Sequence, residues 1–436
     1  MTRHINRRNV LKAAGAASMV ALAGCNGNGN GNGNGNGDDV TGTPDSVMVV
    51  GFPQSGIQLF RDYYGEFADD YDVDIIVPDG LIDSDLPGDV DNDMDNVIGT
   101  EPAADGPGAE FFADSYEDEY GEAPSVFTSH AYDAMAVSVL AAVAAGENDG
   151  EAIRDRMATV ANPTGEEFGP AELPEAVETV AAGDSINYQG ASSSVDFDEN
   201  GDIVSAAYDI VDFQGGELEV VDSLELEAGE IGDVTAEDPV GVDDFEAMVG
   251  VLMPETGDLG PLGGPIRDGA LLAATQINDA DLGVTVDTSV EDTQTDPTAA
   301  ISGAESLVNA GYPAVVGPAG SDQNFPVSTE VYVPNSVVGI SPASTAPGVT
   351  ELDDDGYIFR TAPSDALQGP VMAEVVMDRL GHDTTGTLYL NDEYGQALEE
   401  SYVDGFEDEG GEVYQQVSFE PEQPSYSSQW AEVLDT

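Results

Sequence analysis

Residues 245–269, FEAMVGVLMPETGDLGPLGGPIRDG, decide the fold of this chain of 436 residues. They consist of an apolar run, a loop rich in Gly and Pro, and the start of an amphipathic segment. This succession is typical of a buried strand, a turn and a helix. We therefore interpret 245–269 as the opening unit of an α/β fold, although it stands in the middle of the chain.

The same pattern of strand, turn and helix repeats on both sides of this stretch, from residue 44 onward, which predicts parallel sheets. The expected strands are mostly continuous apolar runs, the kind that is buried on both faces: 47–50, 73–77, 248–253, 284–287, 314–316, 337–340 and 387–390. About 390 residues of this kind exceed a single core, so we expect two lobes. Because open α/β sheets bind ligands beyond the carboxyl ends of their strands, the loops there are the candidate site.

Two helical faces support this interpretation. Their apolar residues recur at helical spacing: Ile266, Ala270, Ala273, Ala274 and Ile277 on the first, and Ala300, Ala304, Leu307 and Val308 on the second. Residues 227–244 are acidic, spaced by Gly and without an apolar period, so we interpret them as a surface linker.

The chain is extremely acidic, with 86 acidic and 10 basic residues and a net charge of -76. Such an imbalance is a property of the whole surface and indicates a salt-adapted protein. Intrinsic disorder is excluded because 41% of the residues are hydrophobic and fall in periodic segments. Nucleic-acid binding is disfavoured because no basic stripe is available to neutralise phosphates.

Residues 1–24 combine Arg7 and Arg8, a short apolar stretch and the sequence LAG before Cys25. This resembles a Tat signal peptide that ends in a lipobox. The resemblance implies export of the folded protein, cleavage before Cys25, lipidation of its sulfur and anchoring at the outer face of the membrane. An uncleaved anchor helix is the alternative. Residues 25–43 carry an Asn-Gly repeat and are interpreted as a tether.

Six loops at the expected strand ends resemble one family. They are PETGDLGPLG (254–263), GPAGSD (317–322), SPASTAP (341–347), NDEYG (391–395), GFPQSG (51–56) and AYDA (131–134). Together they resemble the branched-chain amino-acid binding proteins of ABC importers, the leucine/isoleucine/valine family. The resemblance implies a two-lobed type I periplasmic-binding-protein fold with parallel, doubly wound sheets. It also implies a monomer without cofactor that hands a small amino acid to a permease and its ATPase.

The order of the segments differs from that family. There, the segment like 245–269 comes first, the segment like 426–434 leads into the strand like 47–50, and the segment like 208–226 comes last. We therefore expect a circularly permuted chain in which 227–244 joins the usual termini. A rearranged, non-functional gene product and a truncated tandem copy are the alternatives. Lobe one is expected at 100–361 and lobe two at 44–99 together with 362–436.

The resemblance implies that neutral donors bind the ligand's carboxylate. Ser321 is expected to supply a hydroxyl and backbone N–H groups at a helix start, where the helix dipole favours an anion. Thr345 is the second expected hydroxyl, and Ala343 and Ser344 are expected to complete the contacts. The alternative for Ser321 is an ordinary helix N-cap.

The same resemblance implies an acidic partner for the ligand's ammonium. Asp79 and Gly80 follow the strand 73–77 and match that position, although an Asp chosen among so many is more often solvated surface. Phe52 and Tyr394 match the aromatic walls, with core packing as the alternative. Leu262 stands where family members often carry an aromatic residue, which leaves the identity of the amino acid open.

Metal and catalytic chemistry find little support in the sequence. The stretch 196–201 resembles the start of an EF-hand loop, but Ala207 stands where a Glu is required, so we expect a hairpin turn at Asn200 and Gly201 and no metal. The acid-rich stretch 83–93 is interpreted as a solvated loop.

Beyond the leader the chain has no Lys and only two His residues, and it lacks a G-x-S-x-G motif, so we expect no enzyme. His130 is expected to be structural. A domain of the same fold that senses amino acids, amides or urea is the alternative function. The chain shows no membrane span after its last expected helix, which favours the tethered binding protein.

Overall fold

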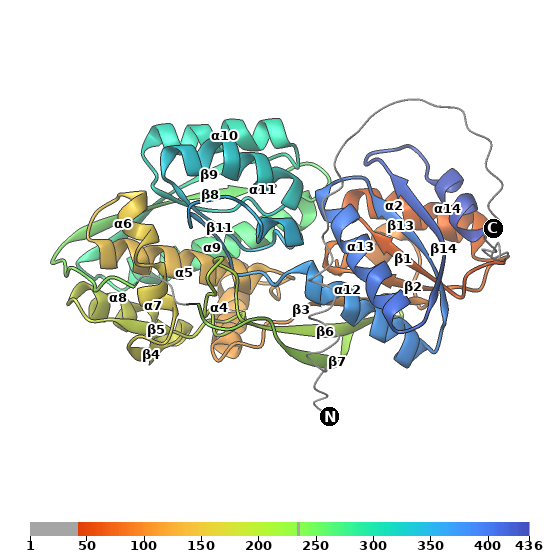
Figure 1. Ribbon diagram of the computed structural model, residues 1–436, viewed down its shortest axis with the longest axis horizontal. Coiled ribbons are helices and arrows are strands. Elements are labelled where there is room, and N and C mark those ends of the chain that lie inside the picture. The colour runs from red at the N-terminus through yellow and green to blue at the C-terminus, as the bar shows by residue number, and fades with distance from the viewer. Residues whose placement is uncertain (1–41, 233–235, 436) are drawn as a thin grey trace, which may run out of the picture.

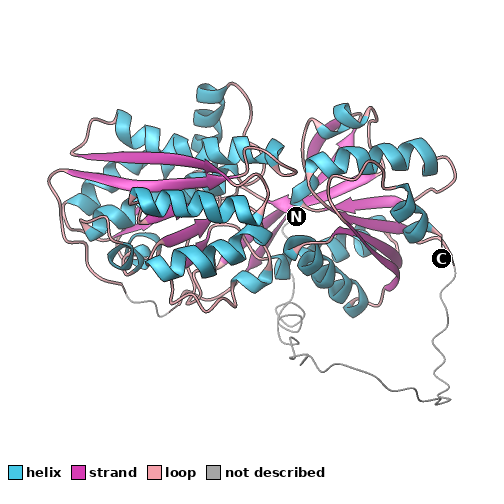
Figure 2. Ribbon diagram, turned by 90° about the horizontal axis from the view of Figure 1, so that it is seen from above, coloured by secondary structure: helices cyan, strands magenta, loops and turns pink. Residues whose placement is uncertain are grey.

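The computed structural model describes residues 42–232 and 236–435; the expected signal peptide, Cys25 and nearly all of the tether lie outside the described residues. The described chain forms two lobes that lie side by side, each built around a sheet with helices on both faces (Figures 1 and 2). No helix within the described ranges combines the length and apolarity needed to cross a bilayer.

The first lobe contains a parallel five-stranded sheet in the order β12-β11-β10-β8-β9. Its strands are β8 (Phe245–Met253), β9 (Val284–Asp292), β10 (Ala314–Val316), β11 (Val338–Ser341) and β12 (Ile358–Arg360). Its main helices are α5 (Thr128–Ala145), α9 (Gly260–Asp279), α10 (Pro297–Ala310) and α11 (Ser321–Val327). Every residue of α5 is buried, because the helix packs against α9 and against β8, β10 and β11.

The second lobe contains a seven-stranded sheet in the order β14-β13-β1-β2-β3-β6-β7. The parallel strands are β1 (Ser46–Val50), β2 (Asp74–Val77), β3 (Val97–Pro102), β13 (Thr384–Leu390) and β14 (Glu412–Phe419), and the antiparallel pair is β6 (Ser205–Gln214) and β7 (Glu217–Glu227). Its helices include α2 (Pro53–Asp62), α3 (Leu86–Val90), α12 (Asp365–Glu374), α13 (Glu393–Asp408) and α14 (Ser427–Leu434).

The remaining elements pack mainly around the first lobe (Figure 1). They are α4 (Ala109–Tyr120), α6 (Gly150–Arg154), α7 (Met157–Ala161), α8 (Leu173–Ala181) and the small parallel pair β4 (Glu166–Phe168) and β5 (Ile186–Tyr188).

The two sheets share one strand order when the second is counted across the ends of the chain. In the first lobe, counting from β8, the spatial order is 2-1-3-4-5, a doubly wound arrangement. The second lobe gives the same order when β13 and β14 are counted first and β1, β2 and β3 follow. The two ends also adjoin in space, because Pro44 and Val433 both flank Gly386 on β13.

All seven strands expected from the sequence are present, and the two expected apolar faces lie on α9 and α10. The expected hairpin turn is present as well: Phe197 pairs with Ile203 in an antiparallel bridge, and Gly201 has a φ of 79°. The lobe boundaries remain a prediction, and β6 and β7 depart from it. Both fall inside 100–361 yet belong to the seven-stranded sheet of the second lobe, since β6 pairs with β3, where Ile98 aligns with Asp212, and β7 pairs with β6.

The expected linker is tied to the first lobe in its described part. The backbone N–H of Val240 donates to Ala144 at 2.9 Å, and that of Val242 donates to Ala181 at 2.8 Å. The side chain of Val240 is nevertheless 57% exposed, which agrees with a surface path.

Candidate functional site

A small cavity lies between the two lobes. The second lobe contributes Phe52, Asp79, Gly80 and Tyr394, and the first contributes Phe127, Leu259, Leu262, Ile266, Ala319, Gly320, Ser321 and Ala343. Nine of these twelve residues lie two to six residues after the end of a strand: β1, β2 and β13 in one lobe, and β8, β10 and β11 in the other. The cavity therefore lies where carboxyl strand ends of both sheets meet, as the strand-end rule predicts.

The structure brings seven of the nine predicted ligand residues to this cavity, namely Phe52, Asp79, Gly80, Leu262, Ser321, Ala343 and Tyr394. The other two lie directly behind it. The Ser344 hydroxyl donates to the Ser321 hydroxyl oxygen at 3.3 Å, and the Thr345 hydroxyl donates to Oδ2 of Asp365 at 2.9 Å. The assignment of all nine to ligand binding stays a prediction.

The acidic side of the cavity is Asp79, whose side chain is only 3% exposed. Its Oδ1 has no hydrogen-bond partner among the described residues, whereas Oδ2 accepts from the Tyr394 hydroxyl at 3.4 Å. Burial raises the pKa of Asp79 to about 6, although the Gln368 amide and the Tyr394 hydroxyl lower it. None of the residues that line the described cavity is basic. A buried carboxylate without a counter-ion is costly, so this position favours an incoming cation.

Sequence analysis missed a second buried acid, Asp365. It is fully buried, and its Oδ1 lacks a partner within the described part of the chain. Burial, followed by the charge of Asp79, raises its pKa well above the ordinary value. Asp365 comes five residues after the end of β12, at the start of α12, so its place near a strand end was the available signal.

Position 80 requires a glycine because neighbouring groups leave no room for a Cβ. A Cβ at this position would lie 2.5 Å from the carbonyl oxygen of Gly51 and 2.9 Å from the Tyr394 hydroxyl. The backbone N–H of Gly80 donates to that hydroxyl at 3.3 Å. A larger residue would therefore push Tyr394 away from Asp79.

The opposite side of the cavity presents neutral hydroxyl and backbone groups. Ser321 is the first residue of α11, and Gly320 occupies the N-cap position, so the alternative of Ser321 as an N-cap is wrong. The Ser321 hydroxyl oxygen instead accepts from the backbone N–H of Ala346 at 3.2 Å. This bond joins the start of α11 to the loop after β11.

The loop after β11 is held in place by hydrogen bonds from Arg360, which sequence analysis did not single out. Its guanidinium donates to the carbonyl oxygens of Ser344 at 3.3 Å and Ala346 at 3.0 Å. Two further bonds, at 2.6 and 2.7 Å, form a fork with both carboxylate oxygens of Asp202. Arg360 is 1% exposed, so this pair fixes the loop from inside the lobe.

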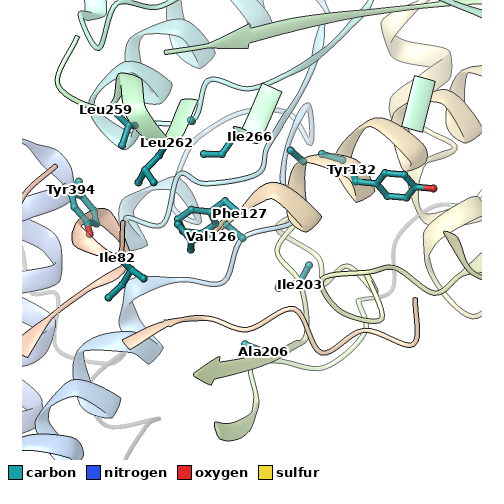
Figure 3. Packing of buried hydrophobic residues seen from close by; sticks show 14 of the residues in the cluster. Ile82, Val126, Phe127, Tyr132, Ile203, Ala206, Leu259, Leu262, Ile266 and Tyr394 are labelled. Carbon is teal, nitrogen blue, oxygen red and sulfur yellow. The ribbon is translucent and has the colours of Figure 1, made fainter. Parts of the chain in front are cut away.

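The walls of the cavity are aromatic and aliphatic. The rings of Phe52 and Tyr394 stack with centroids 5.3 Å apart and planes 8° from parallel. Leu259, Leu262 and Ile266 line the same cavity from α9 and the turn before it, and Figure 3 shows them together with Tyr394. Their spacing places them on one side of a helix, which was a usable signal.

Phe127 completes the apolar wall in an unusual backbone conformation. Its φ of 63° lies in the left-handed region, directly before the first turn of α5. A bulky residue rarely adopts this conformation, and such strain is often found at binding sites. No sequence pattern announces it.

The cavity has a volume of about 20 Å³. This is room for about one water molecule. Any larger ligand therefore requires its walls to separate, and these walls belong to different lobes. Hinged movement of the two lobes is the simplest way to admit it.

His130 is a buried residue of α5 and does not line the cavity. It is 2% exposed within α5, and burial lowers its pKa to about 3, so its ring is neutral near pH 7. The Thr361 hydroxyl donates to its backbone carbonyl at 2.8 Å. Within the described ranges, no group of three or more His, Cys, Asp or Glu residues is arranged to hold a metal ion.

Comparison with known proteins relates the later part of the chain to binding proteins. Residues 246–436 match the family described as periplasmic binding protein. The Leucine-, isoleucine-, valine-, threonine-, and alanine-binding protein of Pseudomonas aeruginosa is 34% identical over 164 residues, which are 37% of this chain and 43% of the relative. The Leu/Ile/Val-binding protein homolog 1 of Brucella abortus is 31% identical over 155 residues, 35% of this chain and 41% of the relative. The chain thus spans less than half of these relatives.

Solved structures give partial matches of the same kind. The branched-chain amino acid transporter substrate binding protein LivJ from Streptococcus pneumoniae, in complex with isoleucine, is 25% identical. It covers 42% of this chain and 52% of its own, with a TM-score of 0.39. The family is one of binding proteins and not of enzymes, which agrees with the expectation from the sequence.

Proposed function

We propose, from the relationship of this chain to the branched-chain amino-acid binding proteins through residues 246–436, that it is the substrate-binding protein of an ABC importer. It captures a branched-chain or other small amino acid between its lobes and delivers it to a membrane permease. The observation that carries this proposal is the cavity at the meeting strand ends, with the unpaired carboxylate of Asp79 on one side and the Ser321 hydroxyl on the other.

In this proposal a zwitterion spans the cavity from one lobe to the other. Its ammonium lies against Asp79 and Tyr394, where a cation removes the cost of the buried negative charge. Its carboxylate lies against Ser321 and Ala343, with Ser344 and Thr345 behind them in the loop that Arg360 holds. Because the ligand contacts both lobes, it favours a form in which the lobes are drawn together around it, with a wider cavity than the one described above.

An aliphatic side chain suits the remaining wall. Leu259, Leu262, Ile266 and Phe127 offer no polar side-chain group, so a ligand hydroxyl or carboxylate pointing there would lose its hydration without compensation. Each buried methylene would contribute about 0.8 kcal/mol.

The test is a thermal melt of residues 38–436 in molar salt with leucine, isoleucine, valine, short amides and urea. A ligand at about one hundred times its dissociation constant adds about 2.7 kcal/mol of stability. Leucine should raise the midpoint, whereas 4-methylpentanoate, which lacks the ammonium, and isoamylamine, which lacks the carboxylate, should not. A rise with amides or urea alone would overturn the substrate, and no rise with any compound would overturn the function.

The order of the chain is proposed to be circularly permuted relative to the family. The equal strand order of the two sheets, counted across the chain ends, supports this, as does the approach of Pro44 to Val433. A reordered chain that runs from 245 to 435 and then from 44 to 227 should melt as cooperatively as this one. Failure of that chain to fold, or a different order on sequencing across the locus, would refute the permutation.

The export and surface properties are proposed on sequence grounds. Cys25 carries the lipid that anchors the protein outside the membrane, and a Cys25→Ser protein should be released into the medium. The net charge of -76 adapts the surface to salt, so the melting midpoint should rise steeply with molar KCl. Retention of the variant in membranes, or a midpoint indifferent to salt, would count against these two points.

A further inference from the structure

Asp258 forms a direct polar contact between the two lobes beside the cavity. It lies in the first lobe, in the loop between β8 and α9, and precedes the cavity residue Leu259. Its Oδ1 accepts from the backbone N–H of Ser55 at 2.7 Å, and its Oδ2 accepts from the Ser55 hydroxyl at 2.7 Å. Ser55 lies in the first turn of α2 in the second lobe. Both residues are buried, at 5% and 2% exposed.

This contact supplies what α2 lacks within its own lobe. The N-cap residue Phe52 makes no side-chain cap, and Pro53 follows it. The first N–H groups of a helix need an acceptor, and the helix dipole favours a negative charge at that end. The carboxylate of Asp258 therefore caps α2 from the opposite lobe, and only while the lobes are together.

We propose that Asp258 is a latch residue, which holds the closed form by capping α2 across the lobe interface and so slows release of the ligand. The inference rests on the proposed function but assigns no ligand contact to Asp258. It is a positioning residue, since its two side-chain bonds go to Ser55, its carbonyl oxygen accepts from the backbone N–H of Gln54 at 3.4 Å, and none of these bonds goes into the cavity.

The groups around Ser55 require a hydrogen-bond acceptor at position 258. The backbone N–H of Glu422 donates to the Ser55 hydroxyl at 3.3 Å, which leaves that hydroxyl's own hydrogen for Asp258. Burial raises the pKa of Asp258 to about 6, while Ser55 lowers it and the charge of Glu422 raises it. Near pH 7 the carboxylate is mostly ionised, and charge-assisted bonds are about twice as strong as neutral ones.

The experiment measures association and dissociation rates of leucine in the whole protein with Asp258→Asn, Ser55→Ala and the double variant. Asp258→Asn keeps the shape of the side chain but turns one acceptor into a donor that faces the Ser55 hydroxyl. We expect dissociation to quicken about tenfold or more, with association changed less than about twofold, because interface changes act mostly on dissociation. The double variant should be no worse than Asp258→Asn alone, since both remove one contact.

Asp292 provides a matched control. It accepts from the backbone N–H of Glu255 at 2.9 Å and from the Thr256 hydroxyl at 2.7 Å, all within the first lobe. Asp292→Asn should leave both rates unchanged. Equal rates in Asp258→Asn and wild type, or an equal effect of Asp292→Asn, would overturn the latch.

A second measurement separates the latch from the proposed function. Small-angle scattering of the protein without ligand should give a larger radius of gyration for Asp258→Asn than for wild type. Should no amino acid bind the wild type, the proposed function fails, but this comparison still decides the latch. Equal radii would then overturn it.

Discussion

Asp79→Asn should stabilise the protein without ligand and weaken its ligand binding. The carboxylate is 3% exposed, its Oδ1 has no partner among the described residues, and no basic residue lines the described cavity. An amide of the same shape removes the buried charge. The same change removes the counter-ion that the proposed ligand's ammonium requires.

The magnitude follows from the pKa. Burial raises the pKa of Asp79 from 3.8 to about 6, which costs the ionised form about 3 kcal/mol at about 1.4 kcal/mol for each pKa unit. Asp79→Asn should recover up to about 3 kcal/mol of stability near pH 7. A hydrogen bond to a charged group contributes about 1.5–3 kcal/mol, so affinity should fall roughly 10-fold to 150-fold.

The assay pairs a thermal melt without ligand with calorimetric titration of leucine. Asp133→Asn is the matched control, because Asp133 is also buried, with a pKa raised to about 6, yet its oxygens accept four hydrogen bonds from Tyr188, Ala191 and Ser192. That variant should lose stability and keep its affinity. If Asp79→Asn melts lower than wild type, or binds leucine equally well, the account of this carboxylate is wrong.

The remaining predictions concern pH and the ion pair under the ligand loop. Burial raises the folded-state pKa of Asp392 to about 7 and that of Asp258 to about 6, both from 3.8. Their stability contribution is present in full below about pH 4 and is lost as the pH rises through 6 to 7, so the melting midpoint without ligand should be higher at pH 5 than at pH 8. Asp202→Asn should cost about 3 kcal/mol in chemical denaturation, because it leaves the Arg360 charge buried without its counter-ion, whereas the exposed Asp353 should tolerate the same change.

The parts of the fold that the sequence predicted are those with a local signal. Apolar runs such as 47–50 and 314–316 became β1 and β10 because strands buried on both faces leave no room for polar residues. Asp79 was singled out because it follows such a run, and the strand-end rule placed it at the cavity. Position along the chain was sufficient evidence in these cases.

The parts that escaped prediction depend on contacts between distant segments. Asp202 and Arg360 are 158 residues apart, and neither lies in a motif that announces a buried fork. The charge of Asp79 acts on Asp365 only because the ends of β2 and β12 reach the same interface between the lobes. The left-handed backbone of Phe127 is imposed by its tertiary surroundings, against the preference of a bulky residue.

The buried carboxylate of Asp79 gives this very acidic protein a basis for selectivity. A chain with a net charge of -76 repels anions of every kind, but at molar salt that repulsion is screened within about 3 Å and discriminates little. Screening does not reach Asp79, which is buried in a cavity whose described lining contains no basic residue. A ligand's carboxylate must therefore rely on neutral donors such as Ser321, and a second carboxylate would face the apolar wall near Leu262. Discrimination against acidic amino acids thus arises inside the closed cavity, where salt has little influence, and not from the charge of the surface.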